Sequence, residues 1–259
     1  MVLMHSLDMC KPPYTILSKF YDLLVNPKQY FAWHKLIEKS VKTYTPRKCK
    51  KVLDLACGTG RMTVLLAQDG YFVFAVDVSS QMLNKAKANI KSAGLTQKVK
   101  FLRQNMLDLN IKSKIDLAIC FYDSLNYLLK KKQLKTVFQK VYNILNPNGL
   151  FIFDINTLEH VRVAKKFDKK AYNVGDGELI FEYGGRGEFW KIKISYIKKG
   201  KLIGEEEHVE RGYDPVEISN LLRNCGFQIK STLDTQFRVC DLESIRSTRV
   251  YFVCQKDGG

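Results

Sequence analysis

From about residue 50 onward, short apolar runs alternate with segments that repeat apolar residues every three to four positions. Such nearly continuous apolar runs are typical of strands buried on both faces of a parallel sheet. They span residues 52–57, 72–77, 99–105, 115–121 and 150–155. Amphipathic helices are predicted between them at 61–68, 79–93 and 134–145. The alternation predicts an α/β fold with a doubly wound parallel sheet and helices on both of its faces.

The pattern changes after Asn156. From about 173 to 211 the sequence reads as alternating strands broken by glycines, which predicts an antiparallel sheet. A helix is expected from about 214 to 225, followed by strands at 227–235 and 249–255, the second of them antiparallel in the first sheet. We therefore expect residues 1–156 and 214–259 to form one domain, with residues 157–213 as an inserted antiparallel β subdomain.

A glycine-rich turn follows the first strand. Gly58 and Gly60 lie between that strand and a helix, and Asp77 ends the next strand. This arrangement presents free backbone N–H groups and a carboxylate that can accept from ribose hydroxyls, so the ligand should contain a nucleoside. A dinucleotide site would want a third glycine where Thr63 stands. Its absence argues against a pyrophosphate and for S-adenosylmethionine.

Asp54 lies in the first strand, just before the glycine-rich turn. Its carboxylate would be costly to bury without a partner, so we expect it to accept from loop N–H groups and to hold the turn in place.

Length and composition narrow the class of protein. A chain of 259 residues with 46% hydrophobic residues can bury a full core. The apolar runs are too short to cross a bilayer and the first residues do not resemble a signal peptide, so a cytoplasmic location is expected. The seven cysteines and four histidines do not follow the spacing of a metal site, and no two cysteines form a C-x-x-C pair. We therefore expect reduced thiols and no metal site.

The net charge of +16 allows a polyanionic partner such as RNA. The lysines are spread along the chain, however, without a block of interleaved arginine and aromatic residues. Biased amino-acid usage is the stronger explanation of the charge, so a small acidic or neutral substrate is favoured over nucleic acid.

Several motifs together resemble the class I S-adenosylmethionine-dependent methyltransferases. They cover roughly residues 50–155 in the expected order: the segments 53–60, 77–79 with Met82, 104–109 and 145–150. Residues 121–127, the inserted sheet and residues 207–211 resemble the branch that contains small-molecule and aminosugar N-methyltransferases. The resemblance implies a Rossmann-like sheet, S-adenosylmethionine as cofactor and S-adenosylhomocysteine as product.

The resemblance also implies roles for individual residues. Asp77 would take both ribose hydroxyls, the backbone of the glycine-rich turn would hold the methionine end, and Phe121 would lie beneath the sulfonium. Asn105 stands where an aspartate is usual, and its carbonyl oxygen can still accept from the adenine amino group. An N-terminal helical lid over residues 14–33 would close on the cofactor. The implied cofactor-binding residues are Tyr14, Tyr21, Ala56, Gly58, Gly60, Asp77, Val78, Met82, Asn105, Met106 and Phe121.

The acceptor should bind beyond the carboxyl ends of the strands. The polar candidates there are Asp123, Asn126, Tyr127, His208, Arg211 and Tyr213. We expect Tyr127, His208 and Asp123 to be catalytic, although methyl transfer needs mainly alignment and exclusion of water, and a base is optional. His208 is equally consistent with an ordinary strand residue, and Arg211 with a salt bridge to a neighbouring glutamate.

Three functions remain open at this point. The favoured one is methyl transfer to a small molecule; the alternatives are an RNA methyltransferase and a non-catalytic S-adenosylmethionine-binding protein. The acceptor atom could be nitrogen, oxygen or carbon. The chain could be a monomer or a homodimer, and no membrane partner is expected.

Overall fold

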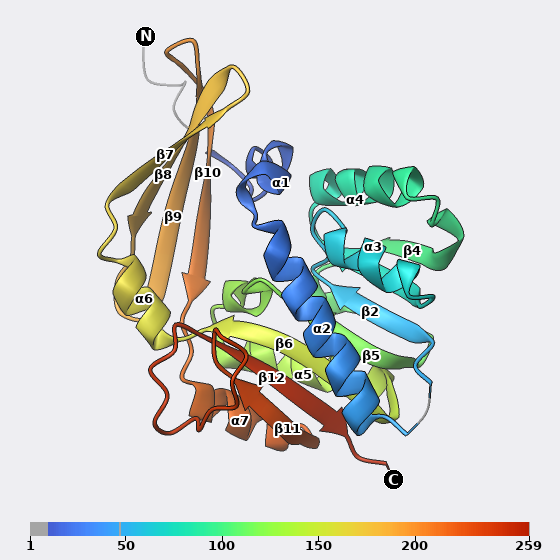
Figure 1. The fold of residues 1–259 in the computed structure, drawn as a ribbon. Helices are drawn as coiled ribbons and strands as arrows, with labels where there is room; N and C mark the ends of the chain where they lie inside the picture. Colours follow the sequence, from blue (N-terminus) through green and yellow to red (C-terminus); the bar gives the residue numbers. More distant parts are fainter. Residues whose placement is uncertain (1–9, 47, 259) are drawn as a thin grey trace.

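The computed structural model describes residues 10–46 and 48–258, which form two β-sheets and the helices around them (Figure 1). The strands are β1 (Cys10–Lys11), β2 (Lys51–Leu55), β3 (Phe72–Asp77), β4 (Val99–Arg103), β5 (Ile115–Cys120), β6 (Leu145–Asn156), β7 (Lys169–Val174), β8 (Gly177–Gly184), β9 (Phe189–Lys198), β10 (Lys201–Arg211), β11 (Phe227–Leu233) and β12 (Arg249–Lys256). The α-helices are α1 (Tyr21–Leu24), α2 (Pro27–Tyr44), α3 (Arg61–Gln68), α4 (Ser80–Ser92), α5 (Lys131–Ile144), α6 (Leu158–Ala164) and α7 (Pro215–Arg223). Short 3-10 helices are η1 (Leu17–Lys19), η2 (Thr96–Lys98), η3 (Met106–Asp108) and η4 (Ser124–Tyr127).

The central sheet has seven strands in the order β11-β12-β6-β5-β2-β3-β4. Strands β6, β5, β2, β3 and β4 run parallel, whereas β12 is antiparallel to both of its neighbours. This is the predicted doubly wound, Rossmann-like α/β sheet with a late antiparallel strand. The carboxyl ends of the parallel strands meet at one edge, where the loops after β2, β3, β4 and β5 come together.

Helices cover both faces of the central sheet because its strands are apolar on both sides. One face packs on α5 and α7 through Phe138 and Leu222, both fully buried. The other packs on α2 and α3 through Trp33 and Leu66, with α4 beside them (Figure 1). The first turn of α4 is capped by Ser79, whose hydroxyl accepts from the N–H of Met82.

The second sheet has five strands in the order β1-β10-β9-β8-β7. Four of them, β7 to β10, are the predicted antiparallel strands, and β1 adds a short parallel strand to the edge of β10. The N-terminal segment after β1 covers one face of this sheet, where Ile16 and Leu17 pack on Leu179 and Ile194. The sequence pattern did not predict that the N-terminus completes this sheet.

The boundary between α5 and β6 differs from the sequence prediction. The predicted helix ends at 145 and the predicted strand begins at 150, but β6 already begins at Leu145, which pairs with Ile115. A register shift then follows before Leu150 pairs with Leu117, and Asn148 has a positive φ of 60°. Residues 146–149 therefore form an irregular start of the strand.

In residues 10–46 and 48–258, no helix is long and apolar enough to cross a bilayer.

Candidate active site

The glycine-rich turn after β2 is held to the end of β3 by Asp77. One carboxylate oxygen of Asp77 accepts from the N–H of Gly58 at 2.9 Å and the other accepts from the N–H of Ser79 at 2.8 Å. Gly58 has a φ of +56°, and a Cβ there would meet no atom within 4 Å, so its backbone faces open space. Gly60 has a φ of +76°, and a Cβ there would lie 2.9 Å from that of Ala86. Gly60 therefore permits close packing of the turn on α4.

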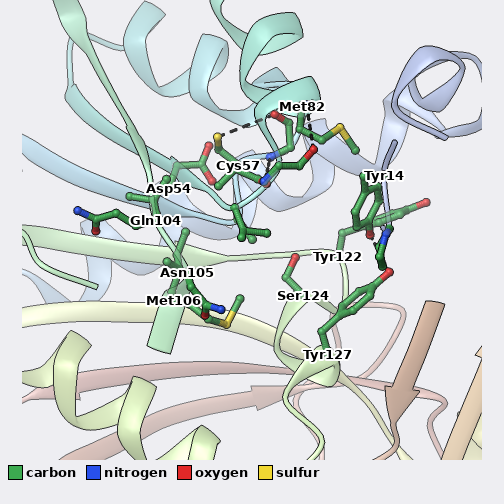
Figure 2. A pocket seen from close by; sticks show the side chains of 18 of the residues that line it. Tyr14, Asp54, Cys57, Met82, Gln104, Asn105, Met106, Tyr122, Ser124 and Tyr127 are labelled. Atoms are coloured by element: carbon green, nitrogen blue, oxygen red, sulfur yellow. Dashed lines mark hydrogen bonds between the residues drawn. The ribbon is translucent and has the colours of Figure 1, made fainter. Parts of the chain in front are cut away.

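A cavity of about 610 Å³ opens at this edge of the sheet, between the glycine-rich turn, the loops after β3, β4 and β5, and the N-terminal segment (Figure 2). Its volume lies within the range of small-molecule sites. The predicted residues that line it are Tyr14, Tyr21, Ala56, Gly58, Asp77, Val78, Met82, Asn105, Met106, Phe121 and Tyr127. Gly60, Asp123 and His208 are outside its lining.

Asn105 precedes the short helix η3 at one end of the cavity. Its side-chain oxygen accepts from the N–H of Leu107 at 2.9 Å, so it caps that helix. A carbonyl oxygen has two lone pairs, and one remains for a ligand. Met106 lines the cavity beside it (Figure 2).

The N-terminal segment is bonded to the glycine-rich turn. Asp22 accepts from the hydroxyl of Thr59 at 2.7 Å and from Nε of Arg61 at 2.8 Å. The guanidinium of Arg61 also donates to the backbone carbonyl of Asp22 at 2.9 Å. These bonds hold the N-terminal segment at the cavity, and Tyr14 and Tyr21 of this segment line it, as the predicted lid requires.

Tyr14, Tyr127 and His208 form a hydrogen-bonded row at the other end of the cavity. The hydroxyls of Tyr14 and Tyr127 lie 2.9 Å apart, and that of Tyr127 lies 2.6 Å from Nδ1 of His208. His208 is 2% exposed and stands behind the two tyrosines. Its Nε2 lies 2.9 Å from the carboxylate of Glu206, a residue that the sequence analysis did not single out. Burial raises the pKa of both tyrosines well above the ordinary value, so the hydroxyls stay protonated.

Asp123 does not face the cavity, contrary to the expectation that it is a substrate-side residue. Its carboxylate pairs with Arg249 at 3.1 Å and accepts from the side-chain amide of Asn156 at 2.8 Å. Arg249 also pairs with the fully buried Asp154. Tyr122 and Asp123 both have positive φ values, and this local turn directs the Asp123 carboxylate toward Arg249. The arrangement indicates a structural ion-pair network.

Three other substrate-side candidates form hydrogen bonds or ion pairs that connect parts of the fold. Asn126 is fully buried and donates to the backbone carbonyls of Asn156 and Arg211. Arg211 pairs with Glu188, which is the salt bridge considered as its alternative, and Tyr213 donates to the carbonyl of Leu128. They join η4 and the loop after it to the inserted sheet.

Asp54 accepts from a side chain rather than from the predicted loop N–H groups. Its carboxylate is 4% exposed and accepts from the hydroxyl of Thr63 at 2.6 Å. Thr63, which stands at the position of the missing third glycine, therefore has a bonding role of its own. Burial raises the pKa of Asp54 to about 7, against the lowering effect of the Thr63 hydroxyl, and the charge of Asp77 raises it further.

Asp54 should make stability depend on pH. Its pKa of about 7 exceeds the ordinary value of 3.8, so the native state keeps a proton that the unfolded chain has lost. This contribution to stability is complete below about pH 4 and is lost as the pH rises toward 7. We expect Asp54→Asn to stabilise the ligand-free protein by about 4 kcal/mol more at pH 8 than at pH 4. Urea unfolding at both pH values, with the exposed Asp108→Asn as control, measures this. Equal pH dependence in all three proteins would contradict it.

Aromatic side chains that the sequence analysis did not single out form much of the cavity wall. Trp33 of α2 stacks parallel on Phe121 with ring centroids 5.1 Å apart, and its indole N–H donates to the hydroxyl of Tyr251. Tyr30 and Tyr122 contact Trp33 edge-on. The aromatic content of residues 14–33 was the available signal, but a long-range contact decides which rings face the cavity.

No group of three or more His, Cys, Asp or Glu side chains suitable for a metal ion occurs in the part of the chain that the structure describes. His5, one of the histidines considered as a ligand, lies outside that part. Cys49, Cys57, Cys120, Cys225, Cys240 and Cys254 are free thiols.

Comparisons with known proteins agree with this geometry. Residues 52–149 match the family described as methyltransferase domain. A putative methyltransferase of Geobacillus sp. strain WCH70 is 36% identical over 254 residues, which cover 94% of this chain and 99% of that protein. A crystal structure of an S-adenosylmethionine-dependent methyltransferase from Clostridium acetobutylicum superimposes with a TM-score of 0.78 at 30% sequence identity. The match covers 94% of this chain and 97% of the chain in that crystal structure. The sugar N-methyltransferase KedS8 of Streptoalloteichus shares the fold, with a TM-score of 0.74 at 15% identity over 99% of both chains.

Proposed function

The chain belongs to the S-adenosylmethionine-dependent methyltransferases, and we propose that its methyl acceptor is a small molecule. The observation that carries this proposal is one continuous cavity that reaches from Asp77 to Tyr127 under the N-terminal segment. An acceptor near Tyr127 would share this cavity with the cofactor. An acceptor of that kind also fits the fold shared with a sugar N-methyltransferase.

The residues present suit the cofactor. Asp77 still has lone pairs for ribose hydroxyls, because each carboxylate oxygen accepts one backbone N–H. The backbone of Ala56 and Gly58 would hold the methionine end, Asn105 and Met106 would bracket the adenine, and Met82 and Val78 would complete the wall. When bound, S-adenosylmethionine supplies a methyl group on a positively charged sulfur, a strong electrophile. The carboxylate of Asp77 places negative charge in the same cavity as this cation, and the aromatic wall of Trp33 and Phe121 would exclude water.

The net charge of +16 favours RNA as a second candidate acceptor, but the cavity does not add to that case. Arg103 is the one basic side chain among the described residues that line it. An RNA substrate would need basic residues along its backbone, and its binding would weaken steeply with salt.

A labelling experiment tests the proposal. The protein is incubated with methyl-labelled S-adenosylmethionine and either a small-molecule extract or an RNA extract, at low and at high salt. We expect label in the small-molecule fraction, with little dependence on salt. Label in RNA that disappears at high salt would replace the proposal with the RNA alternative. Tight cofactor binding without any labelled product would favour a non-catalytic binding protein.

Tyr127 and His208 should affect turnover more than cofactor binding. We expect Tyr127→Phe and His208→Ala to lower kcat about tenfold or more, because each removes one hydrogen-bonding group at the acceptor end of the cavity. Affinity for S-adenosylhomocysteine, measured by calorimetry, should change less than threefold (about 0.7 kcal/mol). Steady-state rates with the acceptor found by labelling complete the comparison. Unchanged kcat in both variants would remove the two residues from the site.

A further inference from the structure

Glu206 is a buried carboxylate that accepts four hydrogen bonds. It lies on β10 and is 0% exposed. One oxygen accepts from the N–H groups of Tyr14 and Leu17, both at 3.2 Å, and the other accepts from the N–H of Ile16 at 2.6 Å. The fourth donor is Nε2 of His208, 2.9 Å from the first oxygen. A buried carboxylate with this many donors has its charge well compensated.

The carboxylate of Glu206 determines which tautomer a neutral His208 ring takes. A carboxylate accepts and does not donate, so Nε2 of His208 carries the proton. In that tautomer Nδ1 is an acceptor for the hydroxyl of Tyr127, whose oxygen lies 2.6 Å away. The oxygen of Tyr127 in turn accepts from the hydroxyl of Tyr14. The hydrogen bonds thus run in one direction, from the cavity wall to Glu206.

We infer that Glu206 is the positioning residue of a proton relay through Tyr127 and His208, and that the methyl acceptor is a protic group, an N–H or an O–H. The inference rests on the proposed function and adds to it the class of acceptor atom. Glu206 acts through His208, since it holds Nδ1 toward Tyr127 and stabilises the imidazolium that forms. The same carboxylate accepts from the backbone N–H of Tyr14, so it also holds the N-terminal segment beside the relay.

The proton transfer balances. When the acceptor nitrogen or oxygen bonds the methyl carbon and the carbon–sulfur electron pair stays with S-adenosylhomocysteine, the neutral methylated product forms only if the acceptor releases one proton. That proton passes to the oxygen of Tyr127 as the hydroxyl proton of Tyr127 passes to Nδ1 of His208. The ring becomes an imidazolium between Tyr127 and Glu206, and the phenol is unchanged. A relaying role suits Tyr127, because its burial together with the nearby Tyr14, Glu210 and Asp123 keeps the phenol protonated.

The predicted position of the proton on the His208 ring can be measured without a methyl acceptor. The chain has four histidines, so long-range proton–nitrogen NMR correlations, assigned with His208→Gln, identify the protonated nitrogen of His208. With S-adenosylhomocysteine as the only ligand, the wild-type ring should carry its proton on Nε2. In Glu206→Gln, whose side chain has one acceptor oxygen instead of two, the Nε2-protonated form should no longer dominate. A proton on Nδ1 in the wild type would overturn the inference.

Amide exchange tests the second role of Glu206. We expect the N–H groups of Ile16 and Leu17 to exchange about tenfold faster or more in Glu206→Gln, because at least one of them loses its acceptor. Glu205→Gln is the matched control, since Glu205 is next in sequence but pairs with Lys193 and Ser195 instead. Equal exchange in both variants would contradict the role. These measurements do not depend on turnover, so a chain that methylated no small molecule would still give them.

Discussion

Replacing Asp77 with alanine is expected to weaken binding of S-adenosylmethionine and S-adenosylhomocysteine by about 10- to 1,000-fold. The carboxylate would accept from both ribose hydroxyls, and each charge-assisted bond contributes roughly 1.5–3 kcal/mol when its partner is otherwise unpaired. A factor of ten corresponds to about 1.4 kcal/mol. The substitution also frees the N–H groups of Gly58 and Ser79, which hold the glycine-rich turn in place. Calorimetric titration with both ligands measures the loss.

Asp77→Asn separates the two contributions. Asparagine keeps one acceptor oxygen, so the turn stays held by one backbone bond while the charge is lost, and we expect an intermediate affinity. Both variants should fold, because Asp77 lies at the open edge of the sheet rather than in its core. A Asp77→Ala protein with wild-type affinity, or one without a cooperative unfolding transition, would show that Asp77 is not the ribose ligand.

Arg249→Met is expected to lower the free energy of unfolding by about 3–5 kcal/mol. Arg249 is the cation shared by Asp123 and Asp154, and its removal leaves two carboxylates in the interior without a counter-charge. Burial already raises the pKa of Asp154 to about 6, against the lowering effect of Arg249. Urea unfolding at pH 8, above the pKa of Asp154 in the wild-type protein, gives the loss.

A double variant provides the control. Arg249→Met combined with Asp154→Asn removes the cation together with one buried charge, so it should lose less stability than Arg249→Met alone. Exposed ion pairs contribute little, so the matched substitution Arg162→Met, which breaks the pair with Glu159, should cost far less stability than Arg249→Met. Equal losses for Arg249→Met and Arg162→Met would mean that the buried network does not stabilise the fold.

The central sheet was predictable because strands buried on both faces leave continuous apolar runs, and the helices between them keep a regular apolar face. The glycine-rich turn and Asp77 were predictable for a related reason: Gly58 and Gly60 have positive φ, and Asp77 ends a buried strand. These features depend on local sequence. The family resemblance then gave S-adenosylmethionine as cofactor, which the comparisons confirm.

The acceptor end was harder to predict because long-range contacts build it. Strand β1 has two residues and so carries no pattern, yet its pairing with β10 brings Tyr14 beside His208. Glu206 looks like one of several glutamates on an alternating strand, and only the placement of the N-terminal segment gives it three of its four donors. Asp123 follows a strand end, as expected of a site residue, but its partner Arg249 lies 126 residues later. Local sequence contains no signal for either outcome.

The stacking of Trp33 on Phe121 makes the site visible to fluorescence. The chain has two tryptophans, and Trp33 lies in the cavity wall, whereas Trp190 lies on β9 of the second sheet against His160. In a Trp190→Phe protein, all indole emission would come from the wall of the cavity. Ligand entry and movement of the N-terminal segment could then be followed in a stopped-flow instrument without an attached dye, and before any acceptor has been identified.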